Sequence, residues 1–259
     1  MNIGQGDLKA WPIPLPPLDE QRRIAGILDR ADVLSAKRSQ ALAHLEDLTQ
    51  AVFLDMFGDP VVNPRELPSR PLSDWVVVGS PITYGILKPG PDVAGGVPYI
   101  RVVDIGGGDV HAGTVRRTSP AIAAAYVRST VAAGDLVISI RGHVGRLGVV
   151  PPGLDGANIT QDSARLRIPP ESREYVGAAL ATTALRHWMA RRTKGAAVQG
   201  INLGDLRTAP ILVPPEGDMR RFEEASEGIR GQIRAAQGHA ATADSLAASL
   251  QRRAFSGQL

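Results

Sequence analysis

The sequence contains no cysteine, which excludes disulfide bonds, thiolate zinc sites and cysteine nucleophiles together. Its five histidines show no ligand spacing such as HExxH, so metal chemistry has little support. No apolar run approaches the roughly 20 residues that a membrane span requires, and no membrane association is expected. The N-terminus lacks a basic start followed by an apolar stretch, so it does not resemble a secretory signal. The expected location is the cytoplasm.

Familiar catalytic signatures are also missing from the sequence. We find no Walker loop, no serine elbow and no Asn-Pro-Pro-Tyr or Asp-Pro-Pro-Tyr of an amino-methyltransferase, and residues 63–66 read as a linker turn. The glycine run 106–108 and the spaced Gly142, Gly145 and Gly148 could be phosphate cradles, but neither opens an evident helix after a strand. We interpret both as turns. The expectation is a chain without catalysis and without a bound cofactor of its own.

The charge balance favours an anionic partner only weakly, because the net charge is +3 with a pI of about 9.5. Its distribution is more informative than its sum. Between Lys88 and Lys194, arginines outnumber acidic residues. The middle of the chain is therefore the basic part.

An internal repeat organises the chain. At an offset of 198 positions, the difference between Ile3 and Ile201, about a dozen residues match in order without a gap. Each copy has a short strand-like or turn stretch, a proline-rich step at 12–17 or 210–215, and then a long helical pattern, because prolines forbid helix until the last one has passed. The helices are expected to begin near Asp19 and Asp218.

Both helical segments carry an apolar stripe of the kind that pairs helices. In the first, rows seven residues apart form an a/d seam interrupted by Arg38. The first seam is Ile24, Ala31, Leu45 and Val52 with Ile27, Leu34, Ala41 and Leu48; the second is Phe222, Ile229, Ala236, Ala243 and Leu250 with Ile233, Ala240, Ala247 and Ala254. At 1.5 Å per residue such helices extend about 55 to 60 Å. We predict an antiparallel two-helix rod; the alternative is two surface helices packed on a globular core.

The segment between the helices has a different character and predicts a separate α+β domain with a twisted sheet. Short β-rich runs alternate with turn signals, and residues 171–193 show helical spacing that ends at Lys194-Gly195. The strand candidates are 75–78, 97–103, 136–140, 147–150 and 164–168.

One loop in this domain stands out as a candidate DNA contact. Arg141, His143 and Arg146 lie on a glycine-rich stretch directly after an apolar strand, and arginine can bind guanine through two hydrogen bonds. The other candidates for DNA binding are Tyr84, Lys88, Arg101, Lys194, Gln199 and Asn202. For each of these residues, an ordinary solvated loop side chain is the alternative.

The sequence resembles the specificity subunits of type I restriction-modification systems. The resemblance rests on motifs that appear in the family's order, together with the repeat. They are Pro-Leu-Pro-Pro-Leu-Asp-Glu-Gln-Arg-Arg-Ile at 14–24, Phe-Gly-Asp-Pro at 57–60, Gly-Asp-Leu-Val-Ile-Ser at 134–139 with Arg141-Gly142, and Val-Gln-Gly-Ile-Asn-Leu at 198–203.

This resemblance implies an architecture in which DNA target-recognition domains alternate with long antiparallel coiled-coil spacer helices. It implies a recognition domain at 60–200, spacer helices at 18–57 and 216–256, and a proline-rich connector at 201–215. The implied partners are double-stranded DNA, methyltransferase subunits that bring S-adenosylmethionine, and restriction motor and nuclease subunits. The implied function is sequence-specific DNA binding that directs adenine methylation and cleavage by those partners.

One departure from the family pattern concerns the N-terminus. A complete subunit has another recognition domain before the first helix, whereas residues 1–17 match only the tail of such a domain. We therefore expect a truncated or half-type subunit that reads one half-site, and a homodimer could restore a two-domain reader. The competing hypothesis is a coiled-coil scaffold without specific DNA recognition. A stand-alone methyltransferase or nuclease is disfavoured by the missing motifs.

Overall fold

The protein is represented by a computed structural model that describes residues 17–195 and 199–255. The chain divides into two compact units. One is continuous, Thr49–Ser226, and the other combines the residues up to Leu48 with those from Glu227 onward. The continuous unit is wider than the predicted recognition domain at 60–200, because it includes one end of each long helix.

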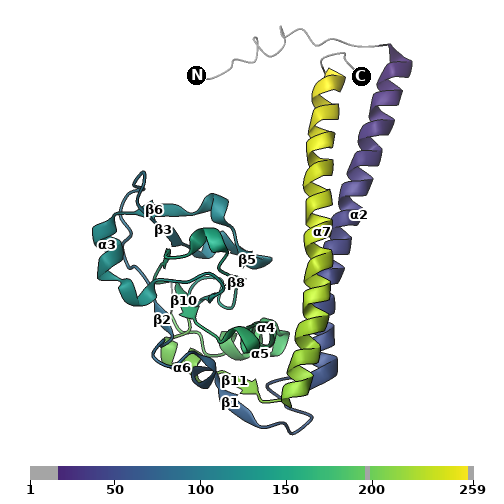
Figure 1. Cartoon of the computed structure of the whole chain (residues 1–259). Coiled ribbons are helices and arrows are strands. Elements are labelled where there is room, and N and C mark those ends of the chain that lie inside the picture. Colours follow the sequence, from purple (N-terminus) through teal and green to yellow (C-terminus); the bar gives the residue numbers. More distant parts are fainter. Residues whose placement is uncertain (1–16, 196–198, 256–259) are drawn as a thin grey trace. The chain divides into compact units, whose positions relative to one another are not determined.

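A six-stranded mixed sheet forms the centre of the continuous unit (Figure 1). Strands β10 and β7 pair antiparallel within it and are buried at every position, including Ser163 and Arg165 of β10. In sheet order the strands are β2 (Thr83–Tyr84), β10 (Ser163–Leu166), β7 (Leu136–Ser139), β8 (Leu147–Val149), β5 (Gly108–Val110) and β4 (Ile105–Gly106).

Two smaller sheets complete the strands that the structure describes. β3 (Val97–Ile100) lies between β6 (Arg116–Thr118) and β9 (Asn158–Ile159). β1 (Ser69–Pro71) pairs antiparallel with β11 (Pro210–Leu212), so the predicted connector contributes a strand that joins the beginning and the end of the unit.

Short helices surround these sheets, and three of the four short α-helices among the described residues are capped by the side chain of the preceding residue. Ser119 caps α3, Thr182 caps α5 and Asn202 caps α6 through side-chain oxygens. The α-helices are α3 (Pro120–Ala125), α4 (Pro170–Ala181), α5 (Thr183–Ala190) and α6 (Leu203–Arg207), with 3-10 helices η1 (Leu72–Trp75), η2 (Val102–Asp104), η3 (Ala112–Thr114), η4 (Val127–Ser129) and η5 (Pro152–Leu154).

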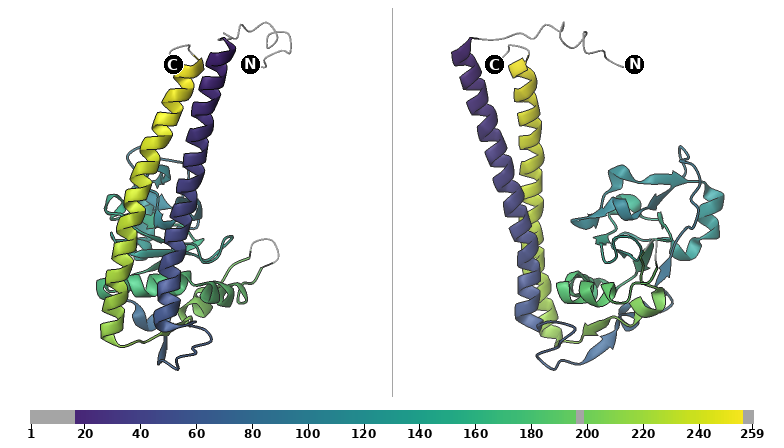
Figure 2. Two further views of the ribbon diagram at one scale, coloured as in Figure 1. Left: turned by 90° about the vertical axis from the view of Figure 1, so that its right-hand side faces the viewer. Right: turned by 180° about the vertical axis from the view of Figure 1, so that it is seen from behind.

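Two helices of 40 residues each, α2 (Leu18–Phe57) and α7 (Glu216–Phe255), begin and end at positions that correspond in the sequence repeat. Leu18 and Glu216 differ by the same 198 positions as Ile3 and Ile201. The predicted starts near Asp19 and Asp218 are confirmed to within two residues. Within the second unit the two helices run side by side in opposite directions (Figures 1 and 2). The first proline-rich step lies almost entirely outside the described residues.

An aromatic cluster at one end of the continuous unit forms part of its main core. Phe53 and Phe57 from α2, Phe222 from α7 and Tyr175 from α4 are buried, and the Phe53 and Phe222 ring centroids lie 5.6 Å apart. The Tyr175 hydroxyl donates to the Leu212 carbonyl at 3.0 Å. The ends of both long helices are thereby packed against α4.

The predicted strands at 136–140, 147–150 and 164–168 are confirmed with small shifts, and 97–103 is a strand only as far as Ile100. The strand predicted at 75–78 is wrong. Ser80 donates its backbone N–H to the Val77 carbonyl, and Gly79 has a φ of 79°, so the chain turns there. Val78, which favoured a strand, is 99% exposed.

Two other expectations need correction. The helix predicted at 171–193 is broken at Thr182, whose extended backbone ends α4 and whose hydroxyl caps α5, and α5 ends at Ala190 rather than at Lys194.

Gly148 is not a turn residue, because it lies within β8 opposite Gly108. A Cβ at Gly148 would lie 2.7 Å from the Asp109 carbonyl oxygen, so this strand pair requires glycine there. Gly142 and Gly145 do lie in a turn with positive φ.

No helix among residues 17–195 and 199–255 is long and apolar enough to cross a membrane. Within the same residues, no group of three or more histidine or acidic side chains could hold a metal ion.

Candidate nucleic-acid interface

The candidate site is built on the loop that connects β7 to β8. The buried Ser139 hydroxyl donates to the His143 carbonyl and accepts from the Arg146 backbone N–H at 2.8 Å. The Gly145 N–H donates to the Ser139 carbonyl at 2.9 Å, and Gly145 has a φ of 90°. These bonds close a tight turn that holds residues 141–143 on the outside of the sheet.

A second segment, residues 199–201, fixes the other side of this loop. The Gly142 N–H donates to the Gln199 carbonyl at 3.0 Å, and the Ile201 N–H donates to the Ile140 carbonyl at 2.9 Å. Gly200 also exchanges two backbone hydrogen bonds with Lys194, at 2.9 and 3.0 Å. A Cβ at Gly200 would lie 2.9 Å from the Ile140 carbonyl oxygen, so the close approach of the two segments depends on glycine.

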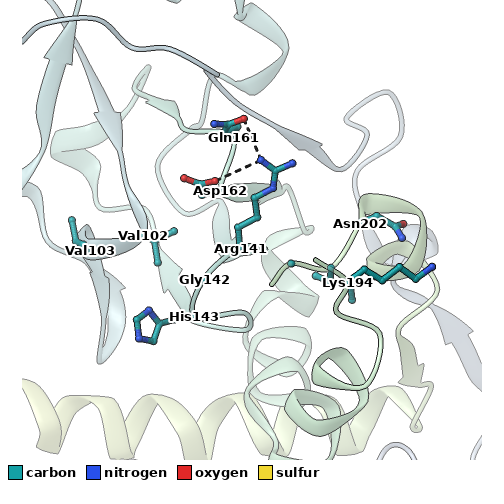
Figure 3. Close-up of a pocket in the computed structure, with 11 residues that line it drawn as sticks. Val102, Val103, Arg141, Gly142, His143, Gln161, Asp162, Lys194 and Asn202 are labelled. Carbon is teal, nitrogen blue, oxygen red and sulfur yellow. Dashed lines mark hydrogen bonds and ion pairs between the residues drawn. The ribbon is translucent and has the colours of Figure 1, made fainter. Parts of the chain in front are cut away.

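These segments border an open cleft of about 620 Å³ (Figure 3). Its charged residues are Arg141, Lys194 and Asp162, and His143 lies beside them. The remaining lining residues are Val102, Val103, Gly142, Gln161, Gly200, Ile201 and Asn202. The cleft thus combines hydrogen-bond donors, cations and one exposed apolar side chain, that of Val103, a set of groups that suits both the phosphates and the base edges of DNA.

Arg141 is oriented by the turn between β9 and β10. Its Nη1 donates to the Gln161 Oε1 at 3.3 Å and lies 4.0 Å from the Asp162 Oδ1 (Figure 3). Gln161 in turn donates through Nε2 to the Leu87 carbonyl at 3.5 Å. The Arg141 and Asp162 side chains are 51% and 45% exposed, so both remain accessible to a ligand.

Four of the nine residues predicted to bind DNA meet in this cleft: Arg141, His143, Lys194 and Asn202. Gln199 is exposed next to Gly200 and contacts the loop through its backbone. The Asn202 amide is occupied within the chain, because it caps α6 through Asp205 at 2.8 Å and also contacts the Asp205 carboxylate. Asn202 is therefore placed at the cleft with its amide groups already bonded.

Arg101 is held by an internal ion pair. Its guanidinium donates to both carboxylate oxygens of Asp104, at 2.8 and 3.0 Å, and to the Thr114 carbonyl at 2.7 Å. Burial of Asp104 alone would raise its pKa, but hydrogen bonds from the Arg101 side chain and backbone and from Thr114 lower the pKa overall. Arg101 therefore has a structural role, in addition to any contact with DNA.

The other three predicted residues are exposed but do not line the cleft. Tyr84, at the end of β2, is 46% exposed, and Lys88 follows Leu87 on the segment that Gln161 contacts. Arg146 is exposed at the far end of the β7–β8 turn. These residues remain candidates for contacts outside the cleft.

Sequence reasoning missed Gln161, Asp162, Val102 and Val103, which also line the cleft. Gln161 and Asp162 are polar residues between two buried strands, β9 and β10, and this sequence pattern is typical of an exposed turn. Val102 and Val103 were expected to continue a strand, and their turn into η2 places Val103 69% exposed at the cleft.

Several arginines of the basic middle segment are structural. Arg165 is buried on β10, where Nη1 donates to the Thr130 carbonyl at 2.9 Å. Burial, and then the charge of Arg167, lowers the pKa of Arg165, while Asp135 opposes that shift. Arg167 pairs with Asp135 at 2.8 Å, and this hydrogen bond raises the pKa of Arg167. The charge excess seen in the sequence is only partly available to a ligand.

Comparison with known proteins gives consistent results. Residues 1–46 match the family model of the type I restriction modification DNA specificity domain. The chain is 27% identical over 281 residues to the type I restriction enzyme EcoBI specificity subunit of Escherichia coli, an alignment that covers 95% of this chain and 58% of that protein. The chain thus spans less than two thirds of the length of this curated relative.

Solved structures share the fold. The HsdS subunit from Thermoanaerobacter tengcongensis matches with a TM-score of 0.54 at 24% identity, over 99% of this chain and 63% of that one. The S subunit of a type I restriction-modification system from M. genitalium matches with a TM-score of 0.54 at 16% identity, over 98% of this chain and 66% of that one. By sequence and by fold, the chain is related to the specificity subunits of type I restriction-modification systems.

Proposed function

We propose that this chain binds DNA in a sequence-specific manner as the specificity subunit of a type I restriction-modification complex. The observation that carries the proposal is the cleft, which Arg141, His143 and Lys194 line from segments that are hydrogen-bonded to one another. Arginine on a braced turn can donate two parallel hydrogen bonds to guanine, and lysine can neutralise a phosphate. The relationship to the EcoBI specificity subunit supports the same role.

In this proposal the chain supplies recognition, and its partners supply catalysis. Methyltransferase subunits carrying S-adenosylmethionine would methylate adenine in the DNA that this chain selects, and restriction subunits would add the motor and the nuclease. This chain itself would bind no cofactor. Residues 60–200 would form the recognition domain.

The two long helices would act as an antiparallel coiled-coil spacer that sets the distance between DNA half-sites and docks the methyltransferase. Their 40-residue lengths support this role, since each extends about 60 Å at 1.5 Å per residue. Along α2, the predicted row at Ile24, Ala31 and Leu45 is partly buried. Leu34 and Leu48 of the other predicted row are 52% and 44% exposed, which leaves apolar surface for a partner subunit.

The test is co-expression of the chain with the methyltransferase subunit from the same operon. The two proteins are expected to purify together, and sequencing of modified bases in DNA from these cells is expected to give one methylated motif that is lost when Arg141 is changed to alanine. Co-purification without any sequence-specific methylation would refute DNA recognition and favour the scaffold hypothesis.

The scaffold hypothesis makes a separate prediction about salt. DNA binding through Arg141, Lys194 and neighbouring cations would weaken steeply with ionic strength, because each neutralised phosphate contributes about −0.9 to the log–log slope. A scaffold that binds only protein would show no measurable affinity for a DNA duplex at low salt.

A further inference from the structure

The cleft contains one feature that phosphate binding does not explain. Among its described lining residues Asp162 is the only acidic one, and its side chain is 45% exposed. A carboxylate near DNA is repelled by phosphates unless it meets a hydrogen-bond donor. In the major groove the amino group of cytosine is a donor that aspartate accepts from. Asp162 is therefore placed to meet a base edge rather than the DNA backbone.

Arg141, next to Asp162, has the complementary chemistry. Its Nη1 faces Gln161 at 3.3 Å and Asp162 at 4.0 Å, and its Nη2 has no hydrogen-bond partner among the residues that the structure describes. Figure 3 shows the guanidinium turned toward these two side chains, while Lys194 extends in another direction. An arginine held in this way places hydrogen-bond donors beside the Asp162 carboxylate, which is an acceptor. A G·C pair has the complementary arrangement, because the O6 and N7 acceptors of guanine lie beside the amino donor of cytosine.

Arg141 Nη1 and Asp162 Oδ1 lie 4.0 Å apart, close enough for both groups to contact one base pair. In a G·C pair the guanine O6 accepts a hydrogen bond from the cytosine N4, so the two atoms lie about 2.9 Å apart at the groove surface. The second N4 hydrogen of cytosine points into the major groove. We propose that Arg141 and Asp162 together read one G·C base pair, Arg141 binding guanine and Asp162 binding cytosine. This inference rests on the proposed DNA-binding function.

The fold does not need the Asp162 side chain at this position. The backbone carbonyl of Asp162 accepts from the Ile140 and Arg141 N–H groups at 2.8 and 3.3 Å, and these bonds survive replacement of the carboxylate. A 4.0 Å ion pair between half-exposed groups contributes little to stability. The effect of removing the Asp162 carboxylate on DNA recognition can therefore be measured in a protein that remains folded.

The experiment is a binding selection from a randomised DNA duplex library, with the full chain alone and with its methyltransferase partner. The proteins compared are wild type, Arg141→Ala and Asp162→Ala. Asp109→Ala and Arg128→Ala remove exposed charges of the same unit that do not line the cleft, and serve as matched controls. The wild-type motif is expected to contain a G·C pair, and both cleft variants are expected to reduce the preference at that pair by about tenfold or more.

Base analogues in the selected duplex identify each contact. Replacing guanine by 7-deazaguanine is expected to weaken wild type and Asp162→Ala but not Arg141→Ala. Replacing cytosine by N4-methylcytosine is expected to weaken wild type and Arg141→Ala but not Asp162→Ala. Both controls should respond like wild type.

The outcomes separate this inference from the proposed function. If the G·C preferences of the wild-type motif survive both substitutions, the shared reading of one base pair is overturned and DNA recognition stays in place. The same holds if the two variants relax the preference at different positions. Uniform weakening at all positions would likewise overturn it. A wild-type protein that selects no motif in either form would refute the proposed function, and this inference with it.

Discussion

Four arginines of the continuous unit fall into two groups according to what their guanidinium groups contact. Arg101 and Arg167 donate to the buried or nearly buried acids Asp104 and Asp135, and Arg165 donates to backbone carbonyls. Arg141 instead contacts half-exposed groups at longer distances. Only an arginine of the second kind can exchange its partners for DNA at low cost, because a buried acid left unpaired is unfavourable.

The Arg101–Asp104 pair leads to a stability prediction. We expect Asp104→Ala to lower the free energy of unfolding by about 2 to 4 kcal/mol, because Asp104 is buried and accepts from Arg101 and Thr114. The carboxyl pKa is lower in the folded than in the unfolded chain. Its stabilisation is therefore present above the unfolded value of about 3.9 and is lost as the pH falls through the folded value.

Urea unfolding of wild type and variant between neutral pH and pH 3 measures both effects. The difference in stability between the two proteins should shrink as the acid limit is approached. Asp162→Ala provides the control. Because the Asp162 side chain is half exposed, the free energy of unfolding of this variant should stay close to that of wild type at every pH. An Asp104→Ala protein as stable as wild type at pH 7 would contradict the structural role assigned to this pair.

At the residue scale, the sequence predicted four of the cleft residues, Arg141, His143, Lys194 and Asn202, and missed the turn at Gln161 and Asp162. Arg141 and His143 were recognisable because they follow an apolar strand on a glycine-rich stretch. Gln161 and Asp162 reach the same cleft only because β10 pairs with β7, an antiparallel register that places Ser163 opposite Ser139. Such pairing of distant strands cannot be read from local composition.

Among the structural elements, the contact between the β7–β8 turn and residues 199–201 decides whether the cleft keeps its shape. We expect Gly200→Ala to destabilise the protein by about 1 to 3 kcal/mol, since the new Cβ would lie 2.8 Å from the Arg141 Cγ and 2.9 Å from the Ile140 carbonyl oxygen. DNA affinity should fall as well, because Arg141 would have to move. Thermal unfolding and DNA titration measure the two effects.

Gly153→Ala is the matched control for this substitution. Its Cβ would meet no atom within 4 Å, so stability and DNA binding should both stay close to wild type. If Gly200→Ala bound DNA with unchanged affinity, the backbone pairing of residues 199–201 would not be what positions Arg141.

At the element scale, the two long helices and the strands at 136–140, 147–150 and 164–168 were predictable, whereas the strand at 75–78 and the continuous helix at 171–193 were not. The two helices were found because their apolar periodicity and proline boundaries are local features, and their bounds agree with the repeat. The strand expected at 75–78 failed because Gly79 allows a turn that the β-branched residues before it do not suggest. The helix expected at 171–193 failed at Thr182, which competes as a cap with continuation of the helix.

For the whole molecule, aromatic residues are concentrated where the long helices enter the continuous unit. The chain has only four phenylalanines, and three of them, Phe53, Phe57 and Phe222, pack around Tyr175. This arrangement fixes the last turns of α2 and the first turns of α7 against α4. Residues Phe53, Phe57 and Phe222 of the two helices are therefore part of the core of the continuous unit.

The aromatic cluster predicts a large loss of stability when one of its rings is removed. Phe222→Ala should lower the free energy of unfolding by about 3 to 5 kcal/mol, because its fully buried ring contacts Phe53, Phe57 and Tyr175. Leu54→Ala, at a position that is 43% exposed on the same helix turn as Phe53, should cost far less. Circular dichroism melts of the two variants compare them directly. Equal melting temperatures would show that the aromatic cluster does not anchor the helices.

Assembly is the largest scale at which the proposed function can be tested. Residues 17–195 and 199–255 contain one globular unit, and in the proposed homodimer two such units, related by twofold symmetry, would read two half-sites. We expect analytical ultracentrifugation of the complex with the methyltransferase subunit to give a mass that contains two copies of the chain. The methylated motif should then be split into two identical, inverted half-sites. A complex that contains a single copy and still methylates a specific motif would refute the dimer and leave recognition by one unit.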